Sequence, residues 1–433
     1  MSYALGHGEF IDVETLLIPE SGRFFIDMIS QRRPNLATFG IRPQTMPHDR
    51  VRVADGISRD ATNIFFVRPT TRNIGNDLIG YATAELLYEV FGPATNIVTI
   101  PALTGPQFGG LAPRQIYDMN RLADGVVVGG GNLFENGQLT YDAQAVEALR
   151  RPMILMAISH GRIEGRDGDQ EDRTDALRPE VIRSLVQRSA VAMVRDNASQ
   201  VILRDMGAEV EVGGCPTLFL PPNSEDWKPE GNVIISVRHP LRMSVSPSLQ
   251  WRTAEDLRCL ITALRAEYSR PVVLACHDYI DLEFAAGFPE ASPAYFDDVG
   301  RYMAALRNCV LHVSYRLHGF LPCLAFGTPS IHLSYDERGR SMLSTVGMES
   351  WDIDLLHERN CIAAIMDHAQ SVDRYRFARR AALPLIARLR QTTISGLKRL
   401  RGVIDAAGQQ RENSDEHESS GPNVPRAVAP SSR

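Results

Sequence analysis

The sequence SYRLHGFLPCLAFGTPSIHLSY, residues 314–335, guides the interpretation of the whole chain. The almost wholly apolar residues 310–313 just before it predict the end of a buried strand. Residues 320–326 predict a short helix that stops at Gly327, and residues 330–333 predict a second strand. This order of elements is typical of a compact β-α-β unit.

Arg316 and His318 lie at the carboxyl end of the first strand of this unit, which is where open α/β sheets bind ligands. Unpaired N–H groups at the start of the helix, with the guanidinium of Arg316 beside them, would bind an anion. His318 can donate or accept a proton near neutral pH. The unit alone fits a buried histidine and an arginine paired with an acidic neighbour equally well, so the other strand ends decide between the two interpretations.

Length and composition indicate a globular protein of more than one domain. The 433 residues are too many for one hydrophobic core, and 44% hydrophobic with 23% charged residues is an ordinary globular composition. A formal net charge of -6 gives no overall attraction to nucleic acid or to anionic membranes. The six cysteines include no C-x-x-C pair, and the amino terminus shows no signal peptide. With no apolar run long enough to span a membrane, these features predict a cytoplasmic protein.

Alternating strand and helix patterns predict an α/β protein with two Rossmann-like domains that face each other across a cleft. We expect the first domain over residues 61–214 and the second over residues 231–372, with a Pro- and Gly-rich break between them. Residues 1–60 predict an irregular amino-terminal extension. A long basic helix is expected over residues 373–406, and residues 407–433, rich in Gln, Glu, Ser and Pro, predict a disordered tail.

Polar or glycine-rich residues follow five of the predicted strands. They include Asn73, Gly75, Asp77, Gly130, Gly131, Asn132, Arg195, Arg238, Arg316 and His318. Because the carboxyl ends of parallel strands point the same way, we expect these residues to lie on one face. The three arginines and a helix amino terminus would together bind a doubly charged anion such as a phosphate, or a carboxylate.

Other kinds of site find less support in the sequence. His277 and Asp278, with Asp281, could bind a metal, but their spacing matches no familiar site and a solvated loop is the commoner explanation. A Walker loop, a Gly-x-Ser-x-Gly elbow and a Gly-x-Gly-x-x-Gly motif after the first strand are all absent. We therefore expect no metal site.

Four segments of the chain resemble the polysaccharide pyruvyltransferase family. They are NIGND at 73–77, ADGVVVGGGNLF at 123–134, VRDNASQVILRDMG at 194–207 and SYRLHGFLPCLAFGTPSIHLSYD at 314–336. The resemblance covers roughly residues 63–350 in the family's order, and R-L-H-G is its most specific part. The first turn is one residue longer than the family's N-x-G-D, and Glu337 and Arg338 stand where the family commonly has a lysine.

The resemblance implies a GT-B-like fold, with the acceptor bound in the first domain and the donor in the second. It implies transfer of a pyruvyl group, as a ketal, from phosphoenolpyruvate to a sugar of a cell-surface polysaccharide or glycolipid, as in exopolysaccharide biosynthesis. Phosphoenolpyruvate would be a co-substrate, with no other cofactor. The acceptor would be a sugar or a lipid-linked oligosaccharide, which leaves room for peripheral association with a membrane-bound acceptor. Nucleic acid is not an expected partner, and the oligomeric state is left open.

The family's motifs also imply roles for individual residues. Arg316 and His318 would hold phosphoenolpyruvate and act in catalysis, with His318 as the acid that protonates the methylene carbon, and Arg195 would be a second anion contact. The remaining expected substrate contacts are Arg238, Leu317, Gly319, Asn73, Gly75, Asp77, Gly130, Gly131 and Asn132. Two alternatives stay open: a GT-B glycosyltransferase that uses a nucleotide-sugar donor, and a non-catalytic glycan-related binding protein.

Overall fold

The computed structural model describes residues 61–419, apart from 105–107, 136, 165–169, 172–174, 225 and 227. It also describes two short strands near the amino terminus, β1 (Ser2–Leu5) and β2 (Glu9–Asp12), which form an antiparallel pair. The sequence had predicted no regular structure there. The rest of the predicted extension lies outside the described residues.

The first domain is built on a parallel six-stranded sheet with the strand order β10-β9-β6-β5-β3-β4. Its strands are β3 (Thr62–Arg68), β4 (Thr95–Pro101), β5 (Gly125–Gly131), β6 (Met153–Ile158), β9 (Val191–Val194) and β10 (Glu211–Val212). Its helices are α2 (Ile74–Phe91), α3 (Pro113–Leu122), α4 (Ala143–Glu147), α5 (Pro179–Arg188) and α6 (Asn197–Asp205). Separate apolar clusters cover the two faces of the sheet, which explains why the central strands are nearly continuous apolar runs. A small antiparallel pair, β7 (Ile163–Glu164) and β8 (Gln170–Glu171), lies outside the sheet.

The second domain repeats this plan with the strand order β13-β12-β11-β14-β15-β16, again all parallel. Its strands are β11 (Val233–Val237), β12 (Val272–Cys276), β13 (Ser292–Tyr295), β14 (Leu311–Ser314), β15 (Ser330–Ser334) and β16 (Asp352–Asp354). Its helices are α7 (Pro247–Tyr268), α8 (Tyr279–Ala285), α9 (Val299–Asn308), α10 (Leu317–Phe326), α11 (Glu337–Thr345) and α12 (Cys361–Ala369). The described residues also include the 3-10 helices η4 (Pro216–Phe219), η5 (Pro240–Arg242) and η6 (Glu349–Trp351). The predicted α/β fold of two Rossmann-like domains is confirmed.

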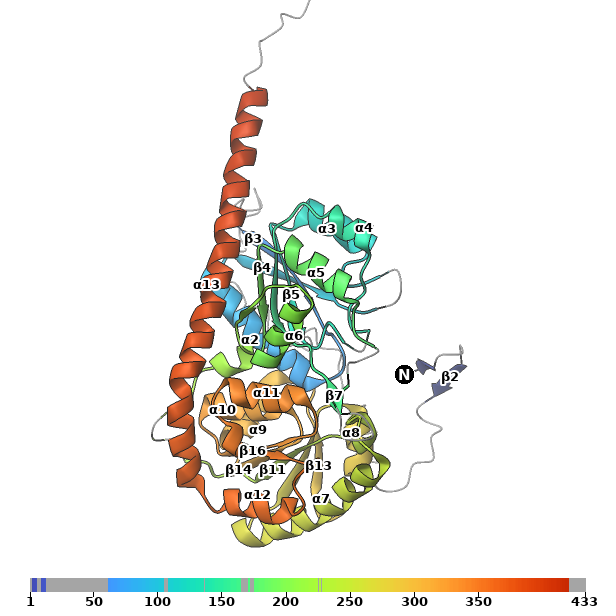
Figure 1. Ribbon diagram of the computed structural model, residues 1–433, viewed down its shortest axis with the longest axis vertical. Coiled ribbons are helices and arrows are strands. Elements are labelled where there is room, and N and C mark those ends of the chain that lie inside the picture. Colours follow the sequence, from blue (N-terminus) through green and yellow to red (C-terminus); the bar gives the residue numbers. More distant parts are fainter. Residues whose placement is uncertain are drawn as a thin grey trace, which may run out of the picture.

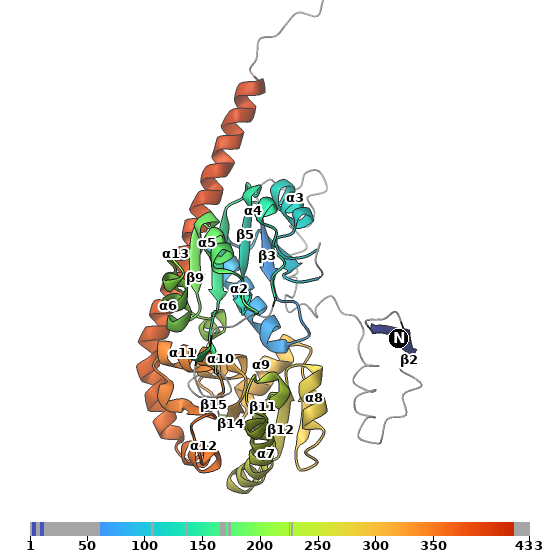
Figure 2. The same cartoon turned by 45° about the vertical axis from the view of Figure 1, so that its right-hand side comes forward.

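Helix α13 (Val372–Ser419) runs along one side of both domains (Figures 1 and 2). Tyr375 and Ile386 belong to the apolar core of the second domain, whereas Leu397 and Leu400 pack with the sheet of the first. The long carboxyl-terminal helix is therefore confirmed, and it fastens the two domains together. The disorder predicted from residue 407 is wrong as far as Ser419, because residues 407–419, which include three Glu and two Gln of good helix propensity, continue the helix.

The helices that lead into the cleft begin earlier than the sequence suggested. Helix α2 begins at Ile74 because the side chain of Asn73 caps it, accepting a hydrogen bond from the backbone N of Gly75 at 2.9 Å. Helix α10 begins at Leu317, with Arg316 as its N-cap, so His318 lies in the first helical turn rather than in a loop before it. The sequence also missed β13 and α8, both short elements at one edge of the second sheet.

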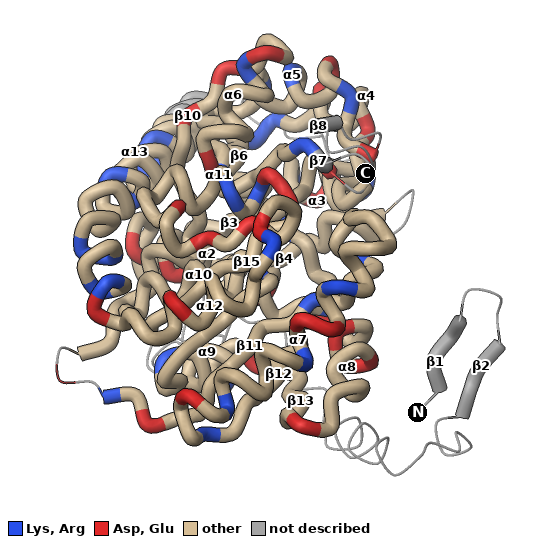
Figure 3. Tube along the Cα trace, turned by 60° about the horizontal axis from the view of Figure 1, so that its bottom comes forward, with Lys and Arg blue, Asp and Glu red and all other residues tan. Residues whose placement is uncertain are grey.

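Charged residues of both signs are spread along the described part of the chain. In the view of Figure 3, acidic and basic residues alternate along the trace. Every helix within the described residues is too short or too polar to cross a bilayer.

Candidate functional site

The carboxyl ends of the two sheets meet at a cavity of about 740 Å³. Residues just after β5, β6 and β9 of the first domain and after β11, β12, β14 and β15 of the second line it. Of the residues expected at the site, eight line the cavity: Asn73, Gly131, Asn132, Arg195, Arg238, Arg316, Leu317 and His318. The expectation that these strand ends share one face therefore holds for this group. Gly75, Asp77, Gly130 and Gly319 do not line the cavity.

Two of these four residues allow the backbone to approach the site closely. A Cβ atom on Gly75 would lie 3.0 Å from the Cβ of His318 and 3.3 Å from Nδ1 of His277, so a larger residue would crowd the approach of α2 to the second domain. A Cβ on Gly319 would lie 2.6 Å from Oγ of Ser314, beneath the first turn of α10. Both glycines therefore allow close packing beside the cavity without lining it.

The other two residues, Asp77 and Gly130, make contacts within the first domain. The carboxylate of Asp77 pairs with buried Arg68 at 3.1 Å, and burial raises its pKa to about 6 in spite of this pairing. Gly130 has a φ of 88°, and a Cβ there would contact Ile79 of α2 at 3.1 Å. In the structure Asp77 and Gly130 thus serve internal pairing and packing, and neither is part of the cavity wall.

Arg316 is fixed by partners within its own domain. Its Nη2 donates to the carboxylates of Asp278, at 3.0 Å, and of fully buried Asp281, and its Nε donates to the carbonyl of Val237 at 3.1 Å. The remaining nitrogen, Nη1, makes no hydrogen bond within the described part of the chain. Arg316 can therefore present one nitrogen of an immobilised fork to an anion in the cavity.

The same contacts weigh against the metal alternative. Asp278 and Asp281 bind the guanidinium of Arg316, and Nε2 of His277 is hydrogen-bonded to the hydroxyl of Tyr302 at 2.8 Å. Within the described residues no group of three or more His, Cys, Asp or Glu side chains is arranged to hold a metal.

Arg195 lines the cavity and carries a buried donor that no hydrogen bond satisfies. Its side chain is only 4% exposed, its Nε lies 3.4 Å from Oδ2 of Asp196, and its Nη2 is buried without a hydrogen-bond partner. A buried nitrogen of this kind costs free energy unless a ligand or water satisfies it. A bound anion that reached Nη2 of Arg195 would satisfy this donor.

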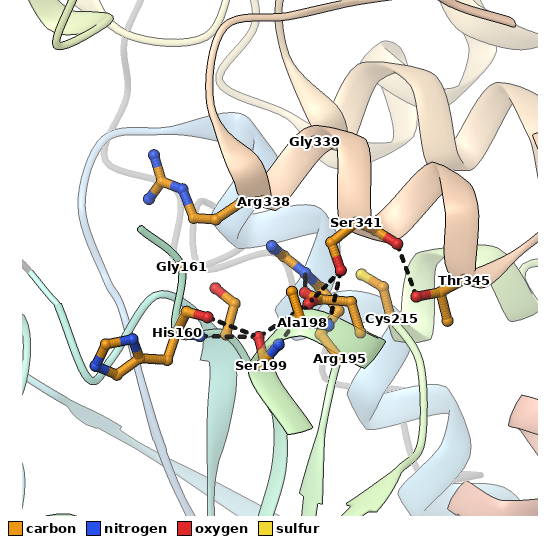
Figure 4. A network of polar contacts seen from close by, with 12 residues as sticks. His160, Gly161, Arg195, Ala198, Ser199, Cys215, Arg338, Gly339, Ser341 and Thr345 are labelled. Atoms are coloured by element: carbon orange, nitrogen blue, oxygen red, sulfur yellow. Dashed lines mark hydrogen bonds and ion pairs between the residues drawn. The ribbon is translucent and has the colours of Figure 1, made fainter. Parts of the chain in front are cut away.

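Contacts from the second domain hold Arg195 and the start of α6 in place (Figure 4). The hydroxyl of Ser341, on α11, donates to Oδ1 of Asp196 and accepts from the backbone N of Ala198, both at 2.9 Å. Oγ1 of Thr345 accepts from the backbone N of Asn197 at 3.0 Å. These side chains satisfy N–H groups that a helix amino terminus leaves open, so the position of Arg195 depends on both domains.

Arg238 and Arg338 line the part of the cavity next to β15. The guanidinium carbon of Arg238 lies 5.8 Å from the ring centroid of Tyr335, within range of a cation–π contact. Arg338 donates to Asp336 at 3.0 Å and to Glu135 of the first domain at 2.9 Å. Burial alone would raise the pKa of Asp336, but Arg338 lowers it to about 2. The sequence showed Arg338 only as a departure from the family's pattern, and its place in the cavity was missed.

His318 lines the cavity among three arginines. Its Nε2 is buried without a hydrogen-bond partner. Burial, together with the positive charges of Arg195, Arg316 and Arg338, lowers its pKa to about 3. His318 can become an acid at neutral pH only if a bound anion offsets these charges.

Two further histidines of the cavity were missed or misjudged from the sequence. His277 was considered only as a metal ligand, but it is held by Tyr302. His332 was read only as part of a buried strand, but its Nδ1 is hydrogen-bonded to Oδ1 of Asp352 at 2.8 Å. The sequence did hold a signal for this position of His332. The residue alternates with Ile331 and Leu333, which belong to the apolar core of the second domain, so its side chain lies on the other face of β15.

Comparison with known protein families identifies the class of protein. Residues 73–337, more than half of the chain, match the family model for polysaccharide pyruvyl transferase. The chain therefore belongs to the polysaccharide pyruvyl transferase family, a family of transferases, as the resemblance of its motifs predicted.

Several solved structures are similar in overall arrangement at low sequence identity. A UDP-GlcNAc 2-epimerase from Methanocaldococcus jannaschii is 13% identical with a TM-score of 0.46, over 71% of this chain and 93% of that one. A putative UDP-N-acetylglucosamine 2-epimerase from Listeria monocytogenes is 11% identical with a TM-score of 0.47, and the match covers 74% of this chain and 91% of that one. A glycotransferase of kitacinnamycin is 13% identical with a TM-score of 0.40, and the match covers 81% of this chain and 99% of that one. No curated protein matches the sequence at a significant level.

Proposed function

We propose that this protein transfers a pyruvyl group from phosphoenolpyruvate to a sugar of a cell-surface polysaccharide or glycolipid, where it forms a ketal. The observation that supports this most directly is the neutral histidine, His318, placed among arginines from both domains in one cavity. Phosphoenolpyruvate has a phosphate and a carboxylate on one enol carbon, so it needs more than one cationic anchor. Its reaction begins with a proton transfer to carbon, which needs an acid at the same place.

Donors for the two anionic groups are present on both sides of the cavity. From the first domain, Nη2 of Arg195 is buried and unpartnered. From the second, Nη1 of Arg316 and the backbone N–H groups of Leu317 and His318 make no hydrogen bonds within the described residues. A helix amino terminus beside a guanidinium is a favourable site for a phosphate. A second anionic group would then satisfy the donor from the opposite domain.

The state of His318 fits an acid that is charged only when the donor is bound. The anion would offset the surrounding arginines and raise the pKa of His318 toward neutrality. The protonated imidazole could then deliver its proton to the methylene carbon, which makes C2 open to attack by a sugar hydroxyl. General acid catalysis of this kind contributes roughly 10²–10⁴-fold to a rate. The arginines would stabilise the departing phosphate, and the scheme needs no cofactor besides the co-substrate.

The cavity volume supports the simultaneous binding of donor and acceptor, because about 740 Å³ is ample for small-molecule substrates. A sugar of a lipid-linked oligosaccharide would be the acceptor, reached by peripheral association with a membrane. We place the reaction in the cytoplasm, since all six cysteines are free thiols and five of them are buried as small apolar side chains.

Isothermal titration of the purified protein tests the proposal. Phosphoenolpyruvate should bind, and a panel of nucleotide-sugars should not. Release of inorganic phosphate from phosphoenolpyruvate, measured with a panel of p-nitrophenyl glycosides and lipid-linked sugars, should then require an acceptor. Binding of a nucleotide-sugar in place of phosphoenolpyruvate would instead indicate a glycosyltransferase, and binding of glycans alone would indicate a recognition protein.

A further inference from the structure

We propose that His332, oriented by Asp352, is the base that takes the proton from the acceptor hydroxyl as its oxygen attacks C2 of the donor. This inference rests on the proposed function and adds a second proton-transfer residue to it. A second group is needed when addition of the hydroxyl is concerted with protonation of the carbon, because one imidazole cannot be the protonated donor and the unprotonated acceptor at the same moment.

His332 and Asp352 are directly opposite each other on neighbouring parallel strands. They are Cα partners in the register of β15 and β16, and Nδ1 of His332 lies 2.8 Å from Oδ1 of Asp352. Their side chains are only 3% and 7% exposed. A carboxylate in this position accepts a hydrogen bond from Nδ1–H and thereby favours the tautomer in which Nε2 has the unshared electron pair.

The imidazole of His332 is held on its other sides as well. The ring of Phe320 meets it edge to face, with 5.7 Å between ring centroids and an interplanar angle of 72°. A Cβ on Gly339 would lie only 2.6 Å from Cε1 of the imidazole, so the start of α11 can pack against this ring only because residue 339 is a glycine. A base that must meet a hydroxyl in one orientation benefits from such a fixed ring.

The second nitrogen of His332 is available to a ligand. His332 lines the cavity together with His318, and its Nε2 makes no hydrogen bond within the described residues. Unlike Nε2 of His318, this atom is not sealed from solvent. In contrast, His312 on the adjacent strand has both nitrogens bonded, to Ser236 at 2.8 Å and to Ser330 at 2.9 Å. His332 thus combines a carboxylate partner, a cavity position and an open nitrogen.

The proton transfers balance when both histidines take part. His318 gives a proton to the methylene carbon, which becomes a methyl group, and the first hydroxyl forms a bond to C2 while its proton moves to Nε2 of His332. The C2–O bond to the phosphate then breaks, the phosphate leaves with the bonding electrons, and it takes the proton from His332. The second hydroxyl closes the ketal and returns its proton to His318. Two hydroxyl protons are thus accounted for, one in the methyl group and one on the phosphate.

Substitution with chemical rescue tests this role. His332→Ala and His332→Gln should bind phosphoenolpyruvate with an affinity within a few-fold of that of the unchanged protein, whereas acceptor-dependent phosphate release should fall roughly 10²–10⁴-fold. Added imidazole should restore part of the turnover of His332→Ala, since the cavity can admit it in place of the lost ring. Asp352→Asn should lower turnover without abolishing phosphoenolpyruvate binding, and imidazole should not rescue it.

A second His–Asp pair provides the matched control. His357 contacts Asp354 through its Nδ1 at 2.9 Å, but its side chain is 69% exposed and does not line the cavity. His357→Ala should leave turnover unchanged, with or without imidazole. If His332→Gln binds phosphoenolpyruvate and keeps full turnover, or if His332→Ala loses turnover in proportion to lost folded protein with no imidazole rescue, the base is not His332 and the pair is structural. If the unchanged protein neither binds phosphoenolpyruvate nor releases phosphate from it, the proposed function fails and this inference fails with it.

Discussion

Arg338 of the second domain donates a hydrogen bond at 2.9 Å to the fully buried carboxylate of Glu135 in the first. The other oxygen of Glu135 accepts from the backbone N of Gly161 at 2.7 Å. Arg338 also pairs with Asp336, so one cavity arginine joins a carboxylate from each domain. Because largely buried Arg338 contacts a carboxylate of each domain, the position of this cavity wall depends on how the two domains are placed relative to each other.

Glu135→Ala should therefore destabilise the protein by about 1.5–3 kcal/mol, because it removes one charged partner from Arg338, which keeps Asp336, and leaves the buried N–H of Gly161 unpaired. Urea unfolding gives the free energy. The control is Glu211→Ala, which breaks a half-exposed ion pair with Arg399 between the first domain and α13 and should change stability by less than about 1 kcal/mol. Equal effects of the two substitutions would contradict the importance of the buried contact.

Arg195→Met should weaken phosphoenolpyruvate binding without a comparable loss of protein stability. The substitution removes a buried Nη2 that has no partner, but it also removes the long 3.4 Å contact of Nε with the buried carboxylate of Asp196, so the two effects oppose each other and the melting temperature should change little. Phosphoenolpyruvate affinity should fall roughly 10- to 150-fold, the equivalent of one hydrogen bond to a charged group, about 1.5–3 kcal/mol. Titration calorimetry and thermal melts give the two quantities.

Arg204→Met, at an exposed position of the same helix α6, should alter neither quantity. A large loss of stability in Arg195→Met with unchanged donor affinity would show that Arg195 is a packing residue instead.

Arg316→Lys should weaken both stability and donor binding, in contrast to the change at Arg195. A lysine cannot bridge Asp278 and Asp281 while also reaching the carbonyl of Val237, since it is a point charge without a planar fork. The expected loss of stability is about 1.5–3 kcal/mol. Arg258→Lys, in an exposed pair with Glu255 at 3.1 Å, is the control and should be nearly neutral in the same urea titration. Unchanged stability of Arg316→Lys would mean that the pairing with the two aspartates contributes nothing.

His318→Ala should leave the fold almost unchanged, because Nε2 of His318 has no hydrogen bond to lose. Phosphoenolpyruvate affinity should fall modestly and turnover by roughly 10²–10⁴-fold, as for a group used mainly in the transition state. A destabilised variant that kept full activity per folded molecule would end the catalytic assignment.

Proton uptake provides an independent test of His318. With a pKa of about 3 in the free protein, this imidazole is uncharged at pH 7, so binding of an anion that raises the pKa toward neutrality should draw a proton from the buffer. Calorimetry in buffers of different ionisation enthalpy should show uptake of a fraction of a proton with the unchanged protein. The uptake should disappear in His318→Ala, and equal uptake in both would assign the proton to another group.

The sequence alone was sufficient for the fold and for the general place of the site. Apolar runs of strand length between amphipathic helices specify a parallel α/β sheet, because each strand must be covered on both faces. Polar and glycine-rich strand ends specify one shared edge, because parallel strands end on the same side. The positions of Arg195, Arg238, Arg316 and His318 just after predicted strands therefore predicted that the four would lie together. In the structure they line one cavity.

Only the tertiary structure decided what each of these side chains does. Asp77 and Gly130 follow strands as expected, yet one pairs with Arg68 and the other packs against Ile79, because the direction of a side chain depends on where its helix or strand is packed. The pairing of His332 with Asp352 joins residues twenty positions apart through strand register. The contact of Arg338 with Glu135 joins two domains. Burial, partner and pKa are properties of such long-range contacts, and no local pattern of residues contains them.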